Sequence, residues 1–326
     1  NVLTALYLGS GDRKGVRETV HSAFLFSILT GLTLLLIGAI FSKGILELLN
    51  TKPELIDGAV LYIRIYFLGM PALAVYNFGN AVFSAAGDTK RPLKYLSMAG
   101  VVNIILNLFF VIVCKMDVAG VAVSSIISQY LSAAMISVAL FRSGDIYGLH
   151  RSELRLNRNK TVNIIRIGIP AGLQGMMFSI ANVCIQSTIN SFGSSAVAGS
   201  AAALNYEFFA YFLVNAFAQA AVTFTSQNYG AGEYNRCKKI FRISLVFALV
   251  SCGILSGIFV MGREFFLRIY TTDADVLVFA RQRIIIATTL ELLTAVYEIS
   301  AGAMRGLGYS LLPAVITCVG SCVIRL

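Results

Sequence analysis

The sequence predicts an all-α polytopic membrane protein. Of its 326 residues, 57% are hydrophobic and only 13% are charged, and the mean hydropathy is +0.78. A soluble domain carries about 25% charged residues, so this chain could not cover its apolar surface in water. Its long uncharged runs match the roughly 20 residues that cross a bilayer core. They lack the alternation of barrel strands, and only helices or closed barrels satisfy their backbone in lipid, so we predict helices.

Nine candidate spans follow one another along the chain. They are predicted at residues 19–41, 55–86, 93–114, 118–141, 162–191, 196–227, 240–262, 276–304 and 310–326. Pro71 lies within the second span and Pro170 near the start of the fifth. Each proline removes a helix hydrogen bond and favours a bend, so we predict hinges at both. Membrane helices also contain proline for packing reasons alone.

The basic residues separate between alternating loops. Seventeen of the 26 Lys and Arg residues fall on one side and eight on the other, with Arg325 set aside at the C-terminal end. By the positive-inside rule the richer side is cytoplasmic, which explains the net charge of +10 without a nucleic-acid partner. The longest loop, 143–161, is then a cytoplasmic linker between an N-terminal lobe at 1–142 and a C-terminal lobe at 162–326.

The sequence contains an internal repeat with an offset of 221 residues, which is the separation of Gly9 and Gly230 (230 − 9). Gly9 aligns with Gly230, and Pro92 aligns with Pro313, with no gap between them. In the same alignment, the Ala-Val-Tyr sequence that ends at Tyr76 matches the Ala-Val-Tyr sequence that ends at Tyr297. Aligned residues lie in loops on the same side, so the two copies are parallel, six-helix units. The chain begins without Met and ends in an apolar run. We therefore expect a fragment of a 6+6 protein with helices 3 to 11, lacking helix 1, most of helix 2 and helix 12.

Motifs for catalysis and cofactors are missing from the sequence. The six cysteines form no CxxC pair or Cys/His metal spacing, and no GxxxxGK[ST] phosphate loop occurs. The turn Gly9-Ser10-Gly11-Asp12 resembles a GxGD protease string, but its repeat ends in Glu233 and no Tyr-Asp pair accompanies it. We therefore expect neither an enzyme nor a resident cofactor.

Acidic residues within spans are the sharpest functional signal, because an ionisable group in hydrocarbon is costly. Glu291, Thr294 and Glu298 follow an i, i+3, i+7 spacing that places them on one helical face, and Glu207 lies in another span. The first copy has Met70, Leu73 and Asn77 in place of the three-residue stripe, so the stripe belongs to the second copy alone. It favours a cation or proton site; the alternative is a structural stripe that pairs with Arg305 or a neighbouring helix.

Neutral polar and aromatic side chains within the spans predict a substrate cavity. Most such residues form interhelical hydrogen bonds, but some should face a polar cavity. The candidates are Asn77, Asn107, Gln174, Asn182, Asn205 and Tyr211. Phe178, Phe208, Phe209 and Tyr211 are candidates for an aromatic wall around an organic cation.

Several motifs together resemble the multidrug and toxic compound extrusion (MATE) family. They are the Ser226–Gly232 turn (SQNYGAG), Gly168-Ile169-Pro170, the Glu298–Gly308 run (EISAGAMRGLG), Ala85–Lys90 (AAGDTK) and Asn103–Asn107 (NIILN). The resemblance covers essentially the whole chain. It implies a monomeric, multi-pass protein of the inner or plasma membrane, in which Na⁺ or H⁺ entry drives export of amphipathic organic cations by alternating access.

The resemblance also guides the choice of coupling residue. Glu298 lies in the helix 10 motif and is the first choice for the coupling ion, with Na⁺ as a possible ligand; Glu291, Thr294 and Glu207 come next. The acid that some members carry in helix 7 is absent around Phe178 and Ser179. Two other readings stay open, a flippase for lipid-linked oligosaccharides of the same superfamily and a non-transporting membrane protein.

Overall fold

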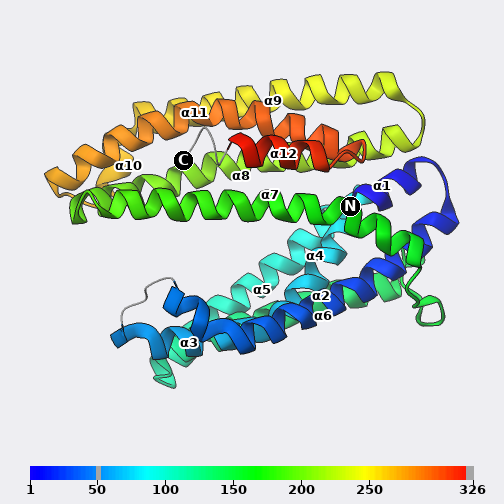
Figure 1. The fold of residues 1–326 in the computed structure, drawn as a ribbon, viewed down its shortest axis with the longest axis horizontal. Helices are drawn as coiled ribbons and strands as arrows, with labels where there is room; N and C mark the ends of the chain where they lie inside the picture. The colour runs from blue at the N-terminus through cyan, green and yellow to red at the C-terminus, as the bar shows by residue number, and fades with distance from the viewer. Residues whose placement is uncertain (49–52, 321–326) are drawn as a thin grey trace. The chain divides into compact units, whose positions relative to one another are not determined.

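The computed structural model describes residues 1–48 and 53–320, and this part of the chain is helical without any strand. Contacts divide it into two compact units (Figure 1). Unit 1 comprises Gly11–Ile164 with Asn1 and Leu3, and unit 2 comprises Ile165–Leu326 with Val2 and Thr4–Ser10. The helices are α1 Val2–Gly9, α2 Arg13–Leu48, α3 Pro53–Leu68, α4 Met70–Ala85, α5 Lys90–Leu108, η1 Phe109–Val113, α6 Asp117–Arg142, η2 Arg151–Glu153, α7 Arg158–Asn190, α8 Ser194–Gly230, α9 Tyr234–Met261, α10 Arg263–Arg268, α11 Ala274–Gly306 and α12 Leu311–Val319.

Seven of the described helices are long and apolar enough to cross a membrane, and the bent pair of α3 and α4 makes an eighth. The all-helical prediction is confirmed. The second predicted span, 55–86, with its expected bend at Pro71, corresponds to α3 and α4, between which the chain bends by 45° at Gly69. For the ninth predicted span, α12 covers the first part, and residues 321–326 lie outside the described residues.

The break between α3 and α4 has a local cause. Gly69 separates the two helices and Pro71 lies in the first turn of α4, where a missing N–H is tolerated. The carbonyl of Leu68 at the end of α3 accepts a hydrogen bond from the Tyr130 hydroxyl at 3.1 Å. The bend is therefore stabilised from α6, while a hinge role for Pro71 stays a prediction. Pro170 instead lies inside α7, which is continuous.

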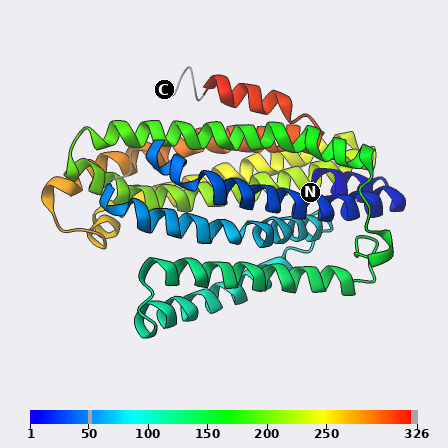
Figure 2. The ribbon, with the colours of Figure 1, turned by 60° about the horizontal axis from the view of Figure 1, so that its bottom comes forward.

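In unit 1, α6 packs against α3, α4 and α5, and α2 packs against α3 and α4. Figure 2 shows α5 and α6 side by side as a hairpin. Val82 and Phe83 of α4 and Ile136 and Leu140 of α6 are almost fully buried. Many large apolar side chains stay exposed on the helices, as Ile104 and Ile112 do, which fits surroundings of lipid rather than water.

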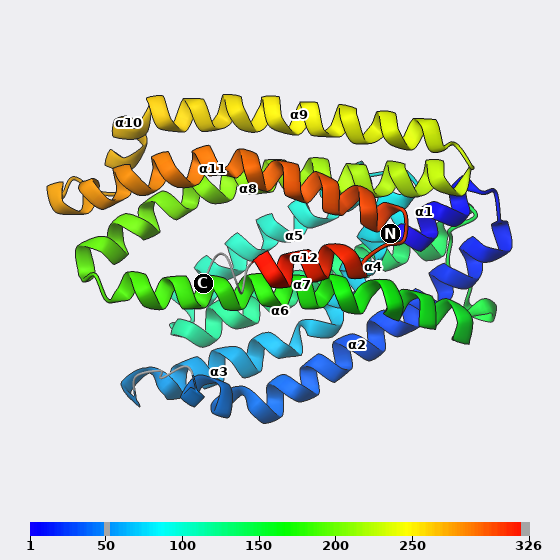
Figure 3. The same ribbon diagram turned by 45° about the horizontal axis from the view of Figure 1, so that its top comes forward.

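In unit 2, α11 packs against both α8 and α9 (Figure 3). Small side chains let these helices approach closely, as in other membrane bundles. The buried cluster between them consists of Val214, Ala218, Ala221, Ala248, Cys252, Ala295 and Ile299. This packing fixes the rotation of α11, and its polar residues then face two cavities that α7 and α8 also line.

Candidate functional site: two cavities along helix α11

The acidic stripe of α11 lines two cavities in unit 2. Glu291 and Thr294 line a cavity of about 560 Å³, and Glu298 lines a second one of about 250 Å³. Both cavities share Phe178 of α7 and Tyr211 of α8, so they adjoin. The i, i+3, i+7 spacing thus places the three side chains along one continuous polar stretch. The larger cavity has the size of a small-molecule site.

Two residues that line the larger cavity form an ion pair between helices. Arg283 of α11 donates to Glu207 of α8, with 3.1 Å between Nη2 and Oε2. Their side chains are 23% and 27% exposed, so each is largely withdrawn from solvent. The sequence predicted Glu207 as a site residue but assigned no role in the site to Arg283. The missed signal is that Arg283 precedes Glu291 by eight residues, which brings it onto a similar side of α11.

A second ion pair lies in the smaller cavity. The Arg305 guanidinium is 3.5 Å from Oε2 of Glu298, and the two side chains are 18% and 14% exposed. Both residues belong to α11, and Nε of Arg305 also donates to the carbonyl of Ala301 on the same helix at 3.4 Å. This is the Arg305 pairing that the sequence left open as an alternative, and it occurs in the same cavity as the predicted ion site.

Neutral hydroxyl and amide groups surround this second pair. Gln174 of α7 donates to the Tyr297 hydroxyl at 2.6 Å, and that hydroxyl forms a hydrogen bond with Thr317 of α12. Thr317 in turn donates to the carbonyl of Pro313 at 2.8 Å. In the first copy the equivalent Tyr76 donates directly to Pro92. In the second copy, the Thr317 hydroxyl therefore lies between the tyrosine hydroxyl and the proline carbonyl. The result is a network of side-chain hydrogen bonds next to Glu298, where the first copy has one direct bond.

The predicted cavity residues divide between the two units. Asn182 and Tyr211 line the larger cavity, and Gln174 and Tyr211 line the smaller one. Asn205 is exposed on α8 and donates to the carbonyl of Ala201 one turn earlier.

The remaining two candidates lie in unit 1. Asn77 is exposed on α4. Asn107 of α5 accepts a hydrogen bond from Ser124 of α6 and donates to Asn103. It thereby joins two helices, the ordinary role of a polar residue in a membrane bundle.

Aromatic residues form part of the wall of the larger cavity. Phe178, Phe208 and Tyr211 line it together with Leu204 and Leu290. Phe209, the fourth predicted aromatic, is 62% exposed and is absent from that lining. The cavity therefore combines an apolar, partly aromatic wall with the charges of Glu207, Glu291 and Arg283, an arrangement suited to amphipathic molecules.

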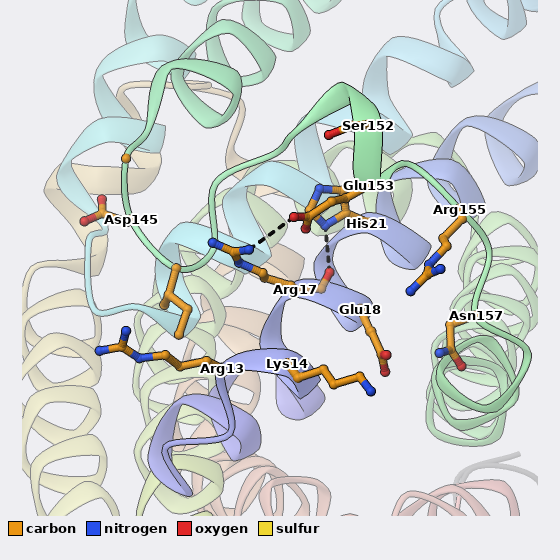
Figure 4. A pocket seen from close by; sticks show the side chains of 12 residues that line it. Arg13, Lys14, Arg17, Glu18, His21, Asp145, Ser152, Glu153, Arg155 and Asn157 are labelled. Atoms are coloured by element: carbon orange, nitrogen blue, oxygen red, sulfur yellow. Dashed lines mark hydrogen bonds and ion pairs between the residues drawn. The ribbon is translucent and has the colours of Figure 1, made fainter.

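Unit 1 contains a further cavity of about 910 Å³ at the N-terminal end of α2 and the loop after α6 (Figure 4). Its charged lining consists of Arg13, Lys14, Arg17, Arg155, Glu18, Asp145 and Glu153. Arg17 and Glu153 form an ion pair at 3.1 Å. Opposite charges are nearly balanced, so the lining favours neither an anion nor a cation.

The loop beside this cavity is fixed to α2 by hydrogen bonds. The buried His21 contacts the carbonyl of Arg17 through Nδ1 at 2.7 Å and accepts the backbone N–H of His150 at Nε2, at 2.9 Å. Ser22 accepts the N–H of Asn157. We call His21 and Ser22 the loop anchor. His21, His150 and Glu153 lie close enough to hold a metal, but both ring nitrogens of His21 already bond backbone groups.

Asp145 in the same loop accepts hydrogen bonds from the Tyr147 and Ser143 hydroxyls, each at 2.8 Å. These hydrogen bonds hold the pKa of Asp145 below its usual value, and the bond from Tyr147 has the largest effect. Burial, aided by the bond to Asp145, raises the pKa of Tyr147 to about 12. Asp145 is therefore ionised at neutral pH and orders the start of the loop.

The seven to eight apolar spans found among the described residues, with charged groups enclosed between them, define a multi-pass membrane protein. The chain belongs to the MatE family, whose family model matches residues 1–109 and 170–326. The predicted family is thereby confirmed, and it is a family of transporters rather than enzymes.

Individual relatives agree with this membership. The probable multidrug resistance protein YoeA of Bacillus subtilis is 24% identical over 324 residues, which cover 97% of this chain and 70% of YoeA. The probable multidrug resistance protein YpnP of the same organism is 32% identical over 236 residues, covering 70% of this chain and 51% of YpnP. This chain thus spans between half and about 70% of their lengths.

Solved structures show the same fold. A MOP superfamily transporter from Pyrococcus furiosus superposes with a TM-score of 0.93 over 99% of this chain and 73% of that chain, at 18% identity. At this identity the similarity concerns the fold. It supports the assignment of two parallel six-helix repeats, which fits the family architecture.

Proposed function

We propose that this chain acts as a multidrug efflux transporter of the cell membrane, an antiporter that exchanges Na⁺ or H⁺ for amphipathic organic cations. Family membership and the names of the relatives YoeA and YpnP support export of drug-like molecules. The larger cavity is the proposed substrate site, since it combines aromatic and aliphatic walls with more acidic than basic side chains. Because one chain lines both cavities, we propose a monomeric functional unit without a resident cofactor.

Glu298 is the proposed coupling residue, with Glu291 and Thr294 assisting from the same helical face. The observation that carries this proposal is the position of Glu298 in a small, polar cavity that adjoins the larger one. Hydroxyl and amide oxygens of Tyr297, Thr317 and Gln174 line the same cavity, and hard cations prefer such oxygen ligands. A cation or proton that binds at Glu298 adds one positive charge to this buried site, and this change biases the protein toward one access state.

The two hinge candidates enter this cycle as sites of bending. Pro71 follows the 45° bend at Gly69, and Pro170 lies in α7 only four residues before Gln174, whose side chain faces the proposed ion site. A change in the curvature of α7 at Pro170 would move Gln174 relative to Tyr297, since the two residues share a hydrogen bond.

The rival function, a flippase for lipid-linked oligosaccharides, requires a strongly basic cavity for a pyrophosphate. The two adjoining cavities of the proposed site contain three acidic residues, Glu207, Glu291 and Glu298, against two basic ones, Arg283 and Arg305. Both arginines also pair with glutamates. This balance favours the antiporter over the flippase.

The test is efflux of a cationic dye from vesicles that contain the intact transporter, with Na⁺ and H⁺ gradients imposed separately. One of the two gradients should drive export, and Glu298→Gln should abolish the dependence on that gradient. Glu264→Gln is the matched control, because Glu264 is an acid paired with Arg281 outside both cavities. Dye export by Glu298→Gln at the parental rate would refute the assignment.

A further inference from the structure

The pairing of Glu298 with Arg305 is unusual because it lies within one helix. The residues are seven positions apart on α11, which is about 10.5 Å along the helix axis. Ion pairs that stabilise a helix normally join residues three or four apart. By contrast, Glu207 and Arg283 join α8 to α11. The Glu298–Arg305 pair therefore neither links two helices nor has the spacing of a helix-stabilising pair.

The contact is also long for two opposite charges. Its N···O distance is 3.5 Å, whereas charge-assisted hydrogen bonds are typically about 2.7–2.9 Å. A largely buried carboxylate needs a countercharge, because an isolated charge away from water is costly. Arg305 supplies that charge without tight bonding, so a small cation in the same cavity can replace it.

The internal repeat indicates that the two charges form one unit. At the offset of 221 residues, Glu298 corresponds to Asn77 and Arg305 to Ser84. The first copy therefore has neither charge, and the second has both. A fold requirement would be expected in both copies, whereas a paired acid and base confined to one copy fits a function of that copy.

Arg305 also has a second favourable position. It lies in the last turn of α11, one residue before the helix ends at Gly306. The carbonyl end of a helix carries partial negative charge and attracts cations. Its Nε already donates to the carbonyl of Ala301. The guanidinium can therefore leave Glu298 and remain stabilised near the helix end.

We propose that Arg305 is an internal counter-ion that competes with the coupling cation for Glu298. Without the coupling ion the guanidinium neutralises Glu298; when the ion binds, the guanidinium withdraws toward the end of α11. This inference rests on the proposed function of Glu298 and adds a regulator to that site. The competition weakens ion binding, so that the ion is released within each transport cycle.

The test compares Arg305→Gln, Arg305→Lys and the parent in vesicles that contain the intact transporter. Half-saturating concentrations of Na⁺ and of H⁺ for dye efflux are measured, together with the maximal rate. Removing the competitor should lower the half-saturating concentration of the coupling ion roughly tenfold, as expected for the loss of a charged hydrogen bond. The maximal rate should fall as well, because the ion is released more slowly. Arg305→Lys should give a smaller shift in the same direction.

Arg281→Gln is the matched control, because Arg281 pairs with Glu264 and lines neither cavity. It should leave both parameters unchanged. The inference is overturned if Arg305→Gln or Arg305→Lys leaves the half-saturating concentration unchanged or raises it while Glu298→Gln abolishes coupling. If Glu298→Gln also retains coupling, the proposed function falls, and the inference falls with it. A fall in the maximal rate alone indicates a structural role and overturns the inference.

Discussion

Gly9 and Gly230 make reciprocal contacts within unit 2. A side-chain carbon on Gly9 would overlap the carbonyl oxygen of Gln227, and one on Gly230 would overlap the carbonyl oxygen of Leu6. Gly9 and Gly230 are equivalent in the internal repeat, and so are Leu6 and Gln227. α1 and the end of α8 therefore cross symmetrically, with each glycine against the carbonyl of the other copy. The repeat found in the sequence is thus visible as a backbone contact.

We predict that Gly9→Ala and Gly230→Ala each destabilise the protein by about 1–3 kcal/mol, because the added carbon forces two backbones apart. The measurement is the thermal unfolding temperature of the purified protein in detergent. Gly257→Ala on α9 is the control, since nothing lies within 4 Å of its added carbon, and alanine favours the helix. Unchanged stability of both Gly9→Ala and Gly230→Ala would contradict the close crossing.

The spans could be predicted because the length of each apolar run can be read directly from the sequence. The repeat could be predicted because its glycines and prolines recur at one constant offset. Pro71 predicted a bend in the second span, but the position of that bend at Gly69 could not be predicted from the sequence. It depends on Tyr130, 62 residues away from Leu68 in the sequence, whose hydroxyl satisfies the free carbonyl. Likewise, spacing placed Glu291 and Glu298 on one face of α11, but periodicity does not indicate which groups the neighbouring helices present to that face.

The second prediction concerns the ion pair of Glu207 and Arg283. Arg283→Met should destabilise the protein by about 1–3 kcal/mol, because it leaves a largely buried carboxylate without its countercharge. The double variant Glu207→Gln with Arg283→Met should regain most of that loss, since no charge remains to be compensated. Chemical unfolding of the two single variants and the double variant measures the coupling. Additive effects would show that the two charges do not interact.

The third prediction concerns the loop anchor. His21→Ala removes the acceptor of the His150 N–H and the contact to the Arg17 carbonyl. Residues 150–157 should then exchange their amide hydrogens faster and become more sensitive to protease, whereas α6 should be unaffected. Arg151→Gln is the control, because Arg151 is exposed. Equal protection of this loop in His21→Ala and in the parent would show that the anchor does not hold it.

The fourth prediction concerns pH and the loop acid Asp145. Its pKa is held below the usual value by hydrogen bonds, so its stabilising contribution is present above the unfolded pKa and is lost as the pH falls through the folded pKa. Tyr147→Phe removes the larger cause and should return the pKa of Asp145 toward its ordinary value. The unfolding temperature should then depend less steeply on pH below about pH 5 than in the parent. An unchanged slope would contradict this role of Tyr147.

The central claim is that Glu298 couples ion entry to export. The most direct measurement is Glu298→Gln in vesicles, with dye binding and gradient-driven dye export determined on the same preparation. We predict that binding stays within about twofold of the parent, since the larger cavity is intact, while the gradient no longer drives export. Export by Glu298→Gln at the parental rate, with the parental dependence on the ion gradient, would contradict the account.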